Sequence, residues 1–283
     1  MENRAEGYDI GMIVTSRSST VVSYEVGTHR LWALSDGYLD MPAALLRDER
    51  DDPAPQVMDT GMLRLAVNCF ALEGPDGDGV LVDCGGGSWA PTVGRLAQSM
   101  AEAGIDPASI TTLALTHTHQ DHIHGLLARG GRVLLPNLQA IVIPAAAVDS
   151  FLDEPDLAQF GRLLKPLQDG APVAAQLRLV TLPGHAAGHS GYAFDSGDDR
   201  ILFIGDIVHV PALQFDKPSL SWGYDDDQPI ARATRRKVFD EAADTGMWIA
   251  GAHLDWPGIG RVIRAGDGFR YESVGGSMKK AGR

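Results

Sequence analysis

The histidines of this chain gather in a few short segments, and this distribution most restricts how the chain can fold. Eight of the nine histidines lie in four segments, and each segment follows an apolar run that predicts a β-strand. Strand ends in layered α/β folds converge on one rim, where functional sites are usually built. We therefore expect the fold to bring these distant segments together. Their histidines are His117, His119, His122, His124, His185, His189, His209 and His253.

Short apolar runs rich in β-branched residues recur along the chain and predict strands. They cover residues 30–35, 63–72, 79–83, 110–116, 139–143, 177–182, 190–195, 200–204 and 247–251. Helical patterns occupy 91–103, with Thr92 as the expected cap, 155–167 and 229–245. Some strands are joined as hairpins, as at the turn 75–79, and others through helices. The mixture predicts a layered α/β domain rather than a strictly alternating parallel sheet.

Two connecting segments have compositions that suggest a role near a site. Residues 40–62 are rich in Asp, Pro and Arg and predict a long loop, a kind of segment that often forms a lid or a binding wall. Gly85, Gly86 and Gly87 follow a predicted strand, but no Lys and no GxGxxG spacing accompanies them. We therefore expect these glycines to permit a close backbone approach rather than to bind phosphate.

Composition and charge exclude several functional classes. The 283 residues, 44% hydrophobic and 22% charged, suit one globular domain, 1–283, built from two packed halves. No apolar stretch approaches the ~20 residues that span a bilayer, and the N-terminus lacks the apolar run of a signal peptide. We expect a cytoplasmic protein with no membrane partner. The net charge of −13 argues against a nucleic-acid partner.

Smaller features of the composition have simple structural interpretations. The basic cluster Arg232, Arg235, Arg236 and Lys237 has helical spacing and predicts a solvated helix face. Cys69 and Cys84 both lie inside apolar runs. They predict a buried pair of thiols, and two cysteines so placed cannot form a disulfide framework or a cysteine-based metal site.

The first histidine segment, residues 116–125, has the composition of a metal site. Side chains two apart in an extended loop point the same way, so His117 and His119 can bind one ion from one side. Asp121 and His122 are then displaced towards a second ion. Imidazole and carboxylate ligands without thiolate suit Zn²⁺, with Mn²⁺, Fe²⁺ and Co²⁺ as alternatives. Burying so many polar groups without partners would cost several kcal/mol, which argues against a structural role.

The later segments complete the pattern. They contain His185 and His189 after one strand, Asp206 and His209 after the next, and His253 after the last. Taken alone, an isolated His or Asp after a strand is most often structural. Taken together and in this order, the segments form a specific signature.

This signature resembles that of the metallo-β-lactamase superfamily. The HxHxDH pattern is intact at residues 117–122, and the later Gly-His turn matches Gly184-His185. The metal-bridging Asp of the family matches Asp206, its last His matches His253, and its early strand ending in Asp matches the run that ends at Asp83. The resemblance implies an α/β fold of the αββα type, with two mixed sheets packed face to face and helices outside.

The resemblance also implies a ligand set for two divalent metal ions, of which zinc is the first expectation. One ion would be bound by His117, His119 and His185. The other would be bound by Asp121, His122 and His253, with Asp206 bridging the two. Asp83 would orient a ligand imidazole, and His189 would lie just outside the ligands.

Two histidines depart from the family pattern. His124 stands where the family usually has Gly, and either supports a ligand or turns outward. His209 stands three residues after Asp206, where many lactonases of another branch carry Tyr. It either donates a hydrogen bond to a developing oxyanion or supports the ligands from outside.

Within the superfamily, the likeness is greatest to methyl parathion hydrolase and its relatives, a branch that includes some N-acyl homoserine lactonases. It is carried by residues 34–37, 205–210, 214–216 and 251–260. The resemblance implies a dinuclear hydrolase in which a bridging hydroxide attacks a lactone or ester carbonyl, with catalytic roles for Asp121, Asp206 and His209. Organophosphate triesters and β-lactams are alternative substrates, and a non-catalytic metal-binding sensor or scaffold is the alternative from another class.

The substrate is expected to be a small molecule. Phe151, Phe160, Phe215 and Trp222 lie in helix or loop segments that could wall an apolar pocket for acyl chains or aromatic leaving groups. The absence of a Gly-x-Ser-x-Gly motif argues against a serine esterase. Relatives in this branch are often dimers, so the resemblance is also compatible with a homodimer.

Overall fold

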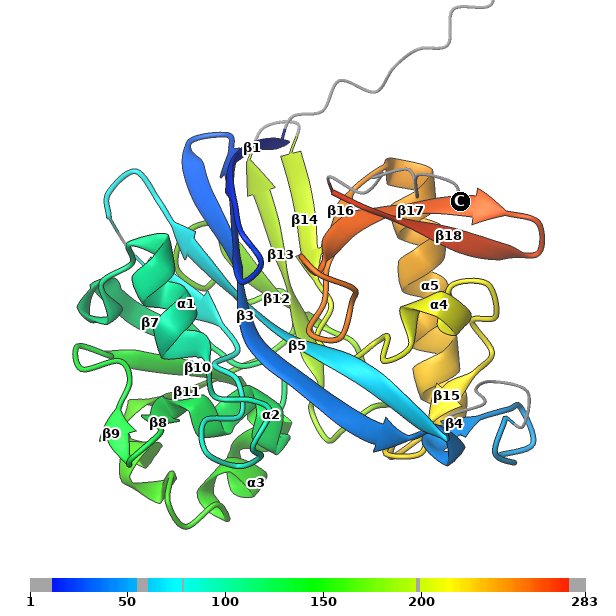
Figure 1. The fold of residues 1–283 in the computed structure, drawn as a ribbon, viewed down its shortest axis with the longest axis horizontal. Helices are drawn as coiled ribbons and strands as arrows, with labels where there is room; N and C mark the ends of the chain where they lie inside the picture. The colour runs from blue at the N-terminus through cyan, green and yellow to red at the C-terminus, as the bar shows by residue number, and fades with distance from the viewer. Residues whose placement is uncertain (1–11, 55–60, 78, 197–198, 275–283) are drawn as a thin grey trace, which may run out of the picture.

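Two mixed β-sheets form the centre of the molecule (Figure 1), in a computed structural model that describes residues 12–54, 61–77, 79–196 and 199–274. The first sheet has the order β1-β2-β3-β5-β6-β7-β10-β11 and the second β12-β13-β14-β16-β17-β18. The first consists of β1 (Met12–Arg17), β2 (Val21–Val26), β3 (His29–Pro42), β5 (Met62–Glu73), β6 (Gly79–Val82), β7 (Ile110–Ala114), β10 (Ala140–Pro144) and β11 (Leu164–Leu167). The second consists of β12 (Leu177–Thr181), β13 (Ser190–Ser196), β14 (Asp199–Phe203), β16 (Trp248–Ala250), β17 (Ile259–Ala265) and β18 (Gly268–Ser273).

Both sheets are buried on two faces, and the alternation of side chains along the strands shows why. In β6, Val80 and Val82 face the core between the sheets, whereas Leu81 faces the outer core. In β14, Phe203 faces the core between the sheets and Leu202 the opposite outer core. A strand buried on both faces requires a covering layer on its outer side. The domain therefore needs four layers, with a helical layer outside each of the two sheets.

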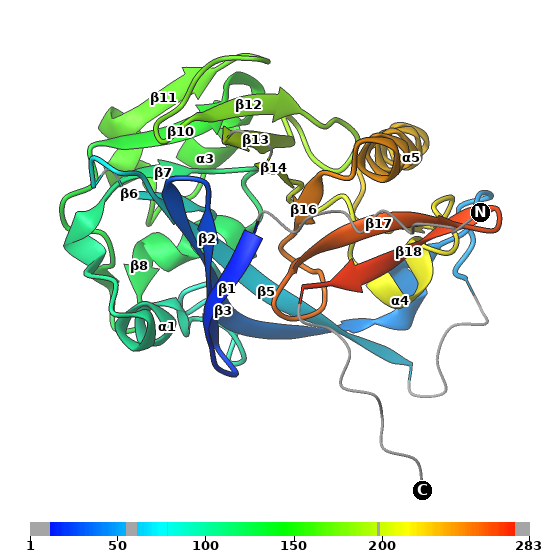
Figure 2. The ribbon, with the colours of Figure 1, turned by 90° about the horizontal axis from the view of Figure 1, so that it is seen from above.

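Helices supply the two outer layers (Figure 2). Helix α1 (Leu96–Ala103) and the short α3 (Val148–Leu152) pack on the first sheet, and α5 (Gln228–Thr245) packs on the second. Two shorter helices, α2 (Gln120–Ile123) and α4 (Pro211–Gln214), lie in connections between strands. Two small ribbons pair β4 (Leu46–Arg47) with β15 (Ser221–Trp222) and β8 (Leu127–Ala128) with β9 (Arg132–Val133). The αββα architecture expected from the resemblance is confirmed.

Most of the predicted elements are present, with two corrections. Every predicted strand is found, and α5 begins where the Asp227 carboxylate accepts a hydrogen bond from the Ile230 amide. The predicted helix 91–103 begins only at Leu96, and Thr92 does not cap it. The predicted helix 155–167 is wrong, because 3-10 turns over Ala158–Leu163 lead into strand β11 there, and Pro166 lies within that strand.

Some structure was not anticipated from the sequence. Strands β1 and β2 form an unexpected hairpin at the edge of the first sheet, and β17 and β18 form another in the second. The predicted loop 40–62 is shorter at both ends, because β3 continues to Pro42 and β5 begins at Met62. Residues 55–60 of that prediction lie outside the described residues. Among the helices that the structure describes, none is long and apolar enough to cross a bilayer.

Candidate metal centre

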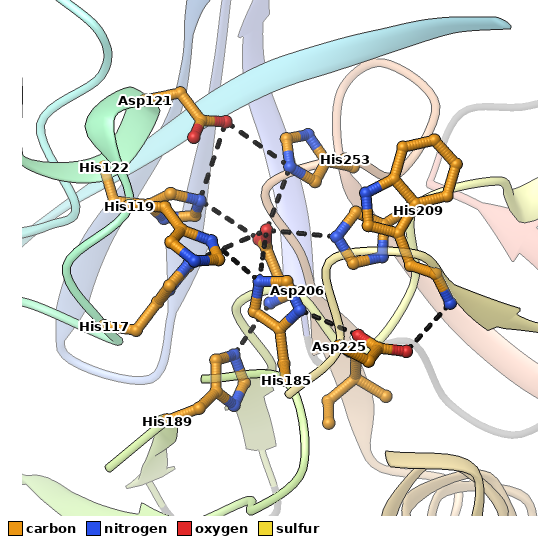
Figure 3. Close-up of polar contacts among 12 residues, drawn as sticks. His117, His119, Asp121, His122, His185, His189, Asp206, His209, Asp225 and His253 are labelled. Carbon is orange, nitrogen blue, oxygen red and sulfur yellow. Dashed lines mark hydrogen bonds and ion pairs between the residues drawn. The ribbon is translucent and has the colours of Figure 1, made fainter. Parts of the chain in front are cut away.

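The predicted ligands converge at one rim of the two sheets (Figure 3). His117, His119, His185 and Asp206 each offer a ligand atom, and these atoms lie within 4.8 Å of one another. Asp121, His122 and His253 form a second group that meets the same criterion. Asp206 joins the two groups, since its Oδ1 lies 3.1 Å from His122 Nε2 and its Oδ2 lies 3.1 Å from His253 Nε2.

The strands explain why these side chains meet. The first segment follows β7 of the first sheet and runs into α2. The other three segments follow β12, β14 and β16 of the second sheet. Backbone hydrogen bonds join them beyond the sheets: the Ser190 amide donates to Thr116 O at 2.9 Å, and the Ile204 amide donates to Ala250 O at 2.7 Å. The site is therefore held by backbone contacts between segments that are distant in sequence.

Acceptors outside the cluster fix the orientation of the imidazoles. His122 Nδ1 donates to Asp83 Oδ2 at 2.9 Å, and His253 Nδ1 donates to Ala66 O at 2.6 Å. His185 Nδ1 donates to Asp225 Oδ1 at 2.8 Å. A neutral imidazole that donates through Nδ1 presents a lone pair at Nε2. All three lone pairs therefore face the centre of the cluster, as metal ligands require.

The polar atoms at the centre lack partners, which is the test of whether ions fit here. His117 Nε2, His122 Nε2, Asp121 Oδ2 and Asp206 Oδ1 are buried without a hydrogen-bond partner. His185 Nε2 also lies only 3.0 Å from His119 Nδ1. Such an arrangement is costly unless a cation lies among the lone pairs. The donor set is nitrogen and oxygen without sulfur, which suits zinc and other first-row divalent ions.

The pKa values of the cluster side chains also indicate that positive charge is favoured at this site. Burial lowers the pKa of His119 to about 4, with the neighbouring His185 as a further cause. Burial disfavours protonation of His185 too, but hydrogen bonds to Asp206 and Asp225 outweigh it and raise its pKa to about 9. The imidazoles around Asp206 hold its own pKa well below the usual range despite burial. Asp206 is therefore ionised, and the site is built around a buried negative charge.

A glycine-rich turn follows Asp83 and positions it beside His122. At Gly85 φ is +76°, and a Cβ there would lie 2.3 Å from Asp36 Cγ. The expected close approach at Gly85–Gly87 is confirmed. The Asp36 carboxylate accepts hydrogen bonds from the amides of Gly86, Gly94 and Leu96, each at 2.9 Å. Asp36 thereby ties the turn to the start of α1.

One residue of the site was missed by the sequence reasoning, namely Asp225. Its Oδ1 accepts from His185, its Oδ2 accepts from the Trp222 amide at 2.8 Å, and Arg235 Nη2 lies 3.8 Å from Oδ2. Arg235 is only 1% exposed and donates to the carbonyls of Ile207, Pro218 and Leu220. The prediction of a solvated basic face is therefore wrong for Arg235, which supports the site from behind.

The three remaining histidines near the cluster have different positions. His189 accepts from the Asp206 amide at 3.0 Å and donates to Leu182 O, so it lies directly outside the ligands. His209 Nε2 lies 3.3 Å from Asp206 Oδ2, and its ring stacks on Trp222 at 4.9 Å between centroids. Burial lowers the pKa of His209 to about 4. His124 turns outward to Glu154, 3.2 Å away, and the prediction that it supports a ligand is wrong.

A pocket of about 530 Å³ opens onto the cluster. Its wall is partly apolar, with Leu39, Met41 and Leu65 from β3 and β5, and with Trp222, which packs in the same hydrophobic cluster as Leu65. Trp89 and Tyr224, 45% and 54% exposed, stand at its mouth. Phe151, Phe160 and Phe215 do not line it, so the prediction is wrong for these three. They lie on helical turns whose apolar sides face the outer cores.

Comparison with known proteins agrees with this geometry. The profile of the metallo-beta-lactamase superfamily matches residues 62–128, which include the HxHxDH motif. None of the curated proteins matches the chain by sequence.

Several solved structures share the fold. AidC, a dizinc quorum-quenching lactonase in complex with the product N-hexanoyl-L-homoserine, is 22% identical with a TM-score of 0.79, over 90% of this chain and 97% of AidC. The hydrolase AbOPH of the β-lactamase superfamily is 25% identical with a TM-score of 0.81, over 91% of this chain and 98% of AbOPH. A probable metal-dependent hydrolase from Staphylococcus aureus is 15% identical with a TM-score of 0.70, over 88% and 98%. The profile, the motif and the fold together identify the chain as containing a metallo-β-lactamase superfamily domain.

Proposed function

We propose that this chain is a metal-dependent hydrolase that opens lactones or cleaves other carboxylic esters of small molecules. The observation that carries the proposal is the convergence of seven ligand side chains at the base of a half-apolar pocket. The fold similarity to AidC, a lactonase, supports a lactone or ester rather than an unrelated substrate. The unpartnered lone pairs favour a functional metal site over a metal-free scaffold.

The residues that would hold two ions are those of the two groups described above, with Asp206 shared between them. Divalent ions bound there supply Lewis acidity, which polarises a carbonyl oxygen and makes water a stronger acid. Asp206 is ionised and lines the pocket, where its carboxylate can accept a proton from an attacking water. Asp121 lines the same pocket and would orient the water from the other side.

His209 would act through Asp206. Its Nε2 points at the Asp206 carboxylate, and its ring is held between Trp222 and His253. A neutral imidazole has a single N–H to donate, and here this hydrogen bond is directed at Asp206. We therefore assign His209 to positioning Asp206, in preference to donating to an oxyanion.

The pocket suits a substrate with an apolar portion. Leu39, Met41 and Leu65 present a continuous aliphatic wall within reach of the cluster. Burying each methylene of an acyl chain against such a wall contributes about 0.8 kcal/mol at most. A medium-length acyl chain would therefore gain several kcal/mol of binding, which would hold its carbonyl at the metal end of the pocket.

A hydrolysis screen of zinc-loaded protein tests the proposal. Acyl homoserine lactones, aryl esters, phosphotriesters and β-lactams are offered at equal concentration, with metal content measured in parallel. We expect turnover of the lactones or aryl esters, about two ions per chain, and loss of both activity and metal in His185→Ala. His124→Ala is the matched control, because His124 faces Glu154 and should leave both unchanged. Turnover of phosphotriesters or β-lactams alone, or full activity in His185→Ala, would overturn the proposal.

A further inference from the structure

Among the described residues that line the pocket leading to the metal cluster, there is no Lys or Arg. We propose that this pocket selects substrates that are electrically neutral outside the reacting bond, and that Asp226 at its mouth excludes those carrying an anionic group. The inference rests on the proposed function, because it specifies which esters the same site accepts. Asp226 would then be a specificity-determining residue.

The composition of the wall is the first observation. Apart from the metal cluster and His209, the described residues that line the pocket are Leu39, Met41, Leu65, Trp89, Gln120, Trp222, Gly223, Tyr224, Asp225 and Asp226. Neither Lys nor Arg occurs among them. Enzymes that bind a carboxylate or phosphate on their substrate usually supply an Arg or Lys for it, because an unpaired buried anion is costly.

Two arginines that lie close to the pocket wall do not line the pocket itself. Arg129 donates to the carbonyls of Ala90, Pro91 and Val93, and so fixes the segment that follows Trp89. Arg235 donates to three carbonyls and lies beside Asp225. Hydrogen bonds from Arg129 Nη2 and from Arg235 Nε and Nη1 to backbone carbonyls hold these two guanidinium groups in place, and neither side chain lines the pocket.

The four carboxylates of the pocket differ in how their charge is balanced. Asp121 and Asp206 belong to the metal cluster, where bound cations offset them. Asp225 is buried and is balanced by His185 and Arg235. Asp226 is exposed at the mouth, and among the described residues no hydrogen bond or ion pair reaches its side chain. Its negative charge is therefore not balanced by a neighbouring cation, and it would repel an anionic substrate that enters the pocket.

An anionic substrate would thus meet two obstacles. It would approach the exposed carboxylate of Asp226 in a protein of net charge −13. It would then lose water against Leu39, Met41 and Leu65 without gaining a partner. Neutral lactones and esters with plain acyl chains meet neither obstacle. An ester with a carboxylate at the far end of its acyl chain meets both.

Three matched aryl esters separate charge from size. 4-Nitrophenyl hexanoate is compared with the mono-4-nitrophenyl ester of adipic acid, in which a carboxylate replaces the terminal methyl group, and with the methyl ester of that acid, which is neutral. Rates are normalised to the hydroxide-catalysed rate of each ester. We expect kcat/KM for the anionic ester to be at least about tenfold below that of its methyl ester, mostly through KM, and the gap to narrow at high salt. Equal values for these two esters would overturn the inference.

Charge reversal tests the role of Asp226. Asp226→Lys should raise the ratio of kcat/KM for the anionic ester to that for the neutral ester at least about tenfold. Asp226→Asn should give a ratio between those of the wild type and Asp226→Lys. Asp76→Lys is the matched control: it makes the same change of net charge in the exposed turn between β5 and β6, at the other end of these strands from the cluster. An unchanged ratio in a folded Asp226→Lys would remove Asp226 from the proposal.

A binding measurement keeps the inference separate from the proposed function. Quenching of tryptophan fluorescence reports occupancy, because Trp89 and Trp222 line the pocket. The probes are N-hexanoyl ethanolamine, which is neutral, and N-hexanoyl taurine, whose sulfonate is a weak metal ligand. We expect a Kd at least about tenfold higher for the taurine amide. If no ester is hydrolysed, the proposed function fails, and this titration still decides the inference: equal Kd values would refute it.

Discussion

The link between Asp225 and His185 gives the sharpest prediction from this structure. Asp225 accepts two hydrogen bonds at 2.8 Å, one from His185 Nδ1 and one from the Trp222 amide. In Asp225→Asn the side chain keeps a single oxygen, so either His185 loses its acceptor or the Trp222 amide faces another donor. Figure 3 shows the contact between His185 and this carboxylate. The substitution is nearly isosteric, so lost packing cannot explain its effect.

The magnitude follows from the contacts that are lost. A buried hydrogen bond to a charged group contributes about 1.5–3 kcal/mol, and Arg235 also loses its carboxylate neighbour while keeping its carbonyl acceptors. We expect the free energy of unfolding to fall by about 2–4 kcal/mol. Loss of a hydrogen-bonded carboxylate behind a ligand imidazole typically lowers metal affinity about 10–100-fold.

Urea unfolding measures the first quantity, and competition with a chromogenic chelator measures the second. Asp227→Asn is the matched control, since Asp227 caps α5 by accepting from the Ile230 amide at 3.0 Å. Asn caps helices about as well as Asp, so both quantities should stay close to wild type. Wild-type metal affinity in Asp225→Asn would refute the idea that this carboxylate orients His185.

Three further predictions concern the frame of the site and its ions. Gly85→Ala should destabilise the fold by several kcal/mol in thermal unfolding, because φ is +76° and the new Cβ would collide with Asp36. Gly104→Ala is the control, since Gly104 has a φ of +72° but open space around it, and it should cost only the backbone strain of about 1 kcal/mol. Equal losses in the two variants would contradict the collision. Asp36→Ala should lower the free energy of unfolding by at least about 3 kcal/mol, since two buried amides and one partly buried amide lose their acceptor. A loss below about 1 kcal/mol in urea unfolding would be incompatible with these hydrogen bonds. Chelation should lower the Tm, and added zinc at about 100 times its Kd should restore about 2.7 kcal/mol; a Tm that does not respond to either would contradict a metal site.

The sequence predicted well what local periodicity and motif spacing determine. Strands such as β6 and β14 were found because their continuous apolar runs are typical of strands buried on both faces. The ligand residues were found because HxHxDH places imidazoles and a carboxylate at spacings with few structural uses. The hairpin of β17 and β18 was missed because polar residues such as Arg261 and Glu272 mask its alternation.

What the sequence did not predict depends on contacts between distant segments. Asp225 lies in a loop without periodicity, and only the packing of that loop on His185 shows its role. Phe151 and Phe215 were placed in the pocket because an aromatic residue gives no indication of which side of its turn faces a core. The charge of Asp226 likewise gained meaning only when its neighbours at the mouth were known.

Asp206 is shared between the two ligand groups, and this has a consequence for how the protein would unfold. His117 and His122 extend from the first sheet, whereas His185, Asp206 and His253 extend from the second, so ions in this cluster would cross-link the two sheets. Separating the sheets would then require release of metal. Unfolding of the holoprotein in urea should therefore be slower than unfolding after chelation. An apolar substitution between the sheets, such as Phe203→Leu, should accelerate unfolding in both states without touching a ligand.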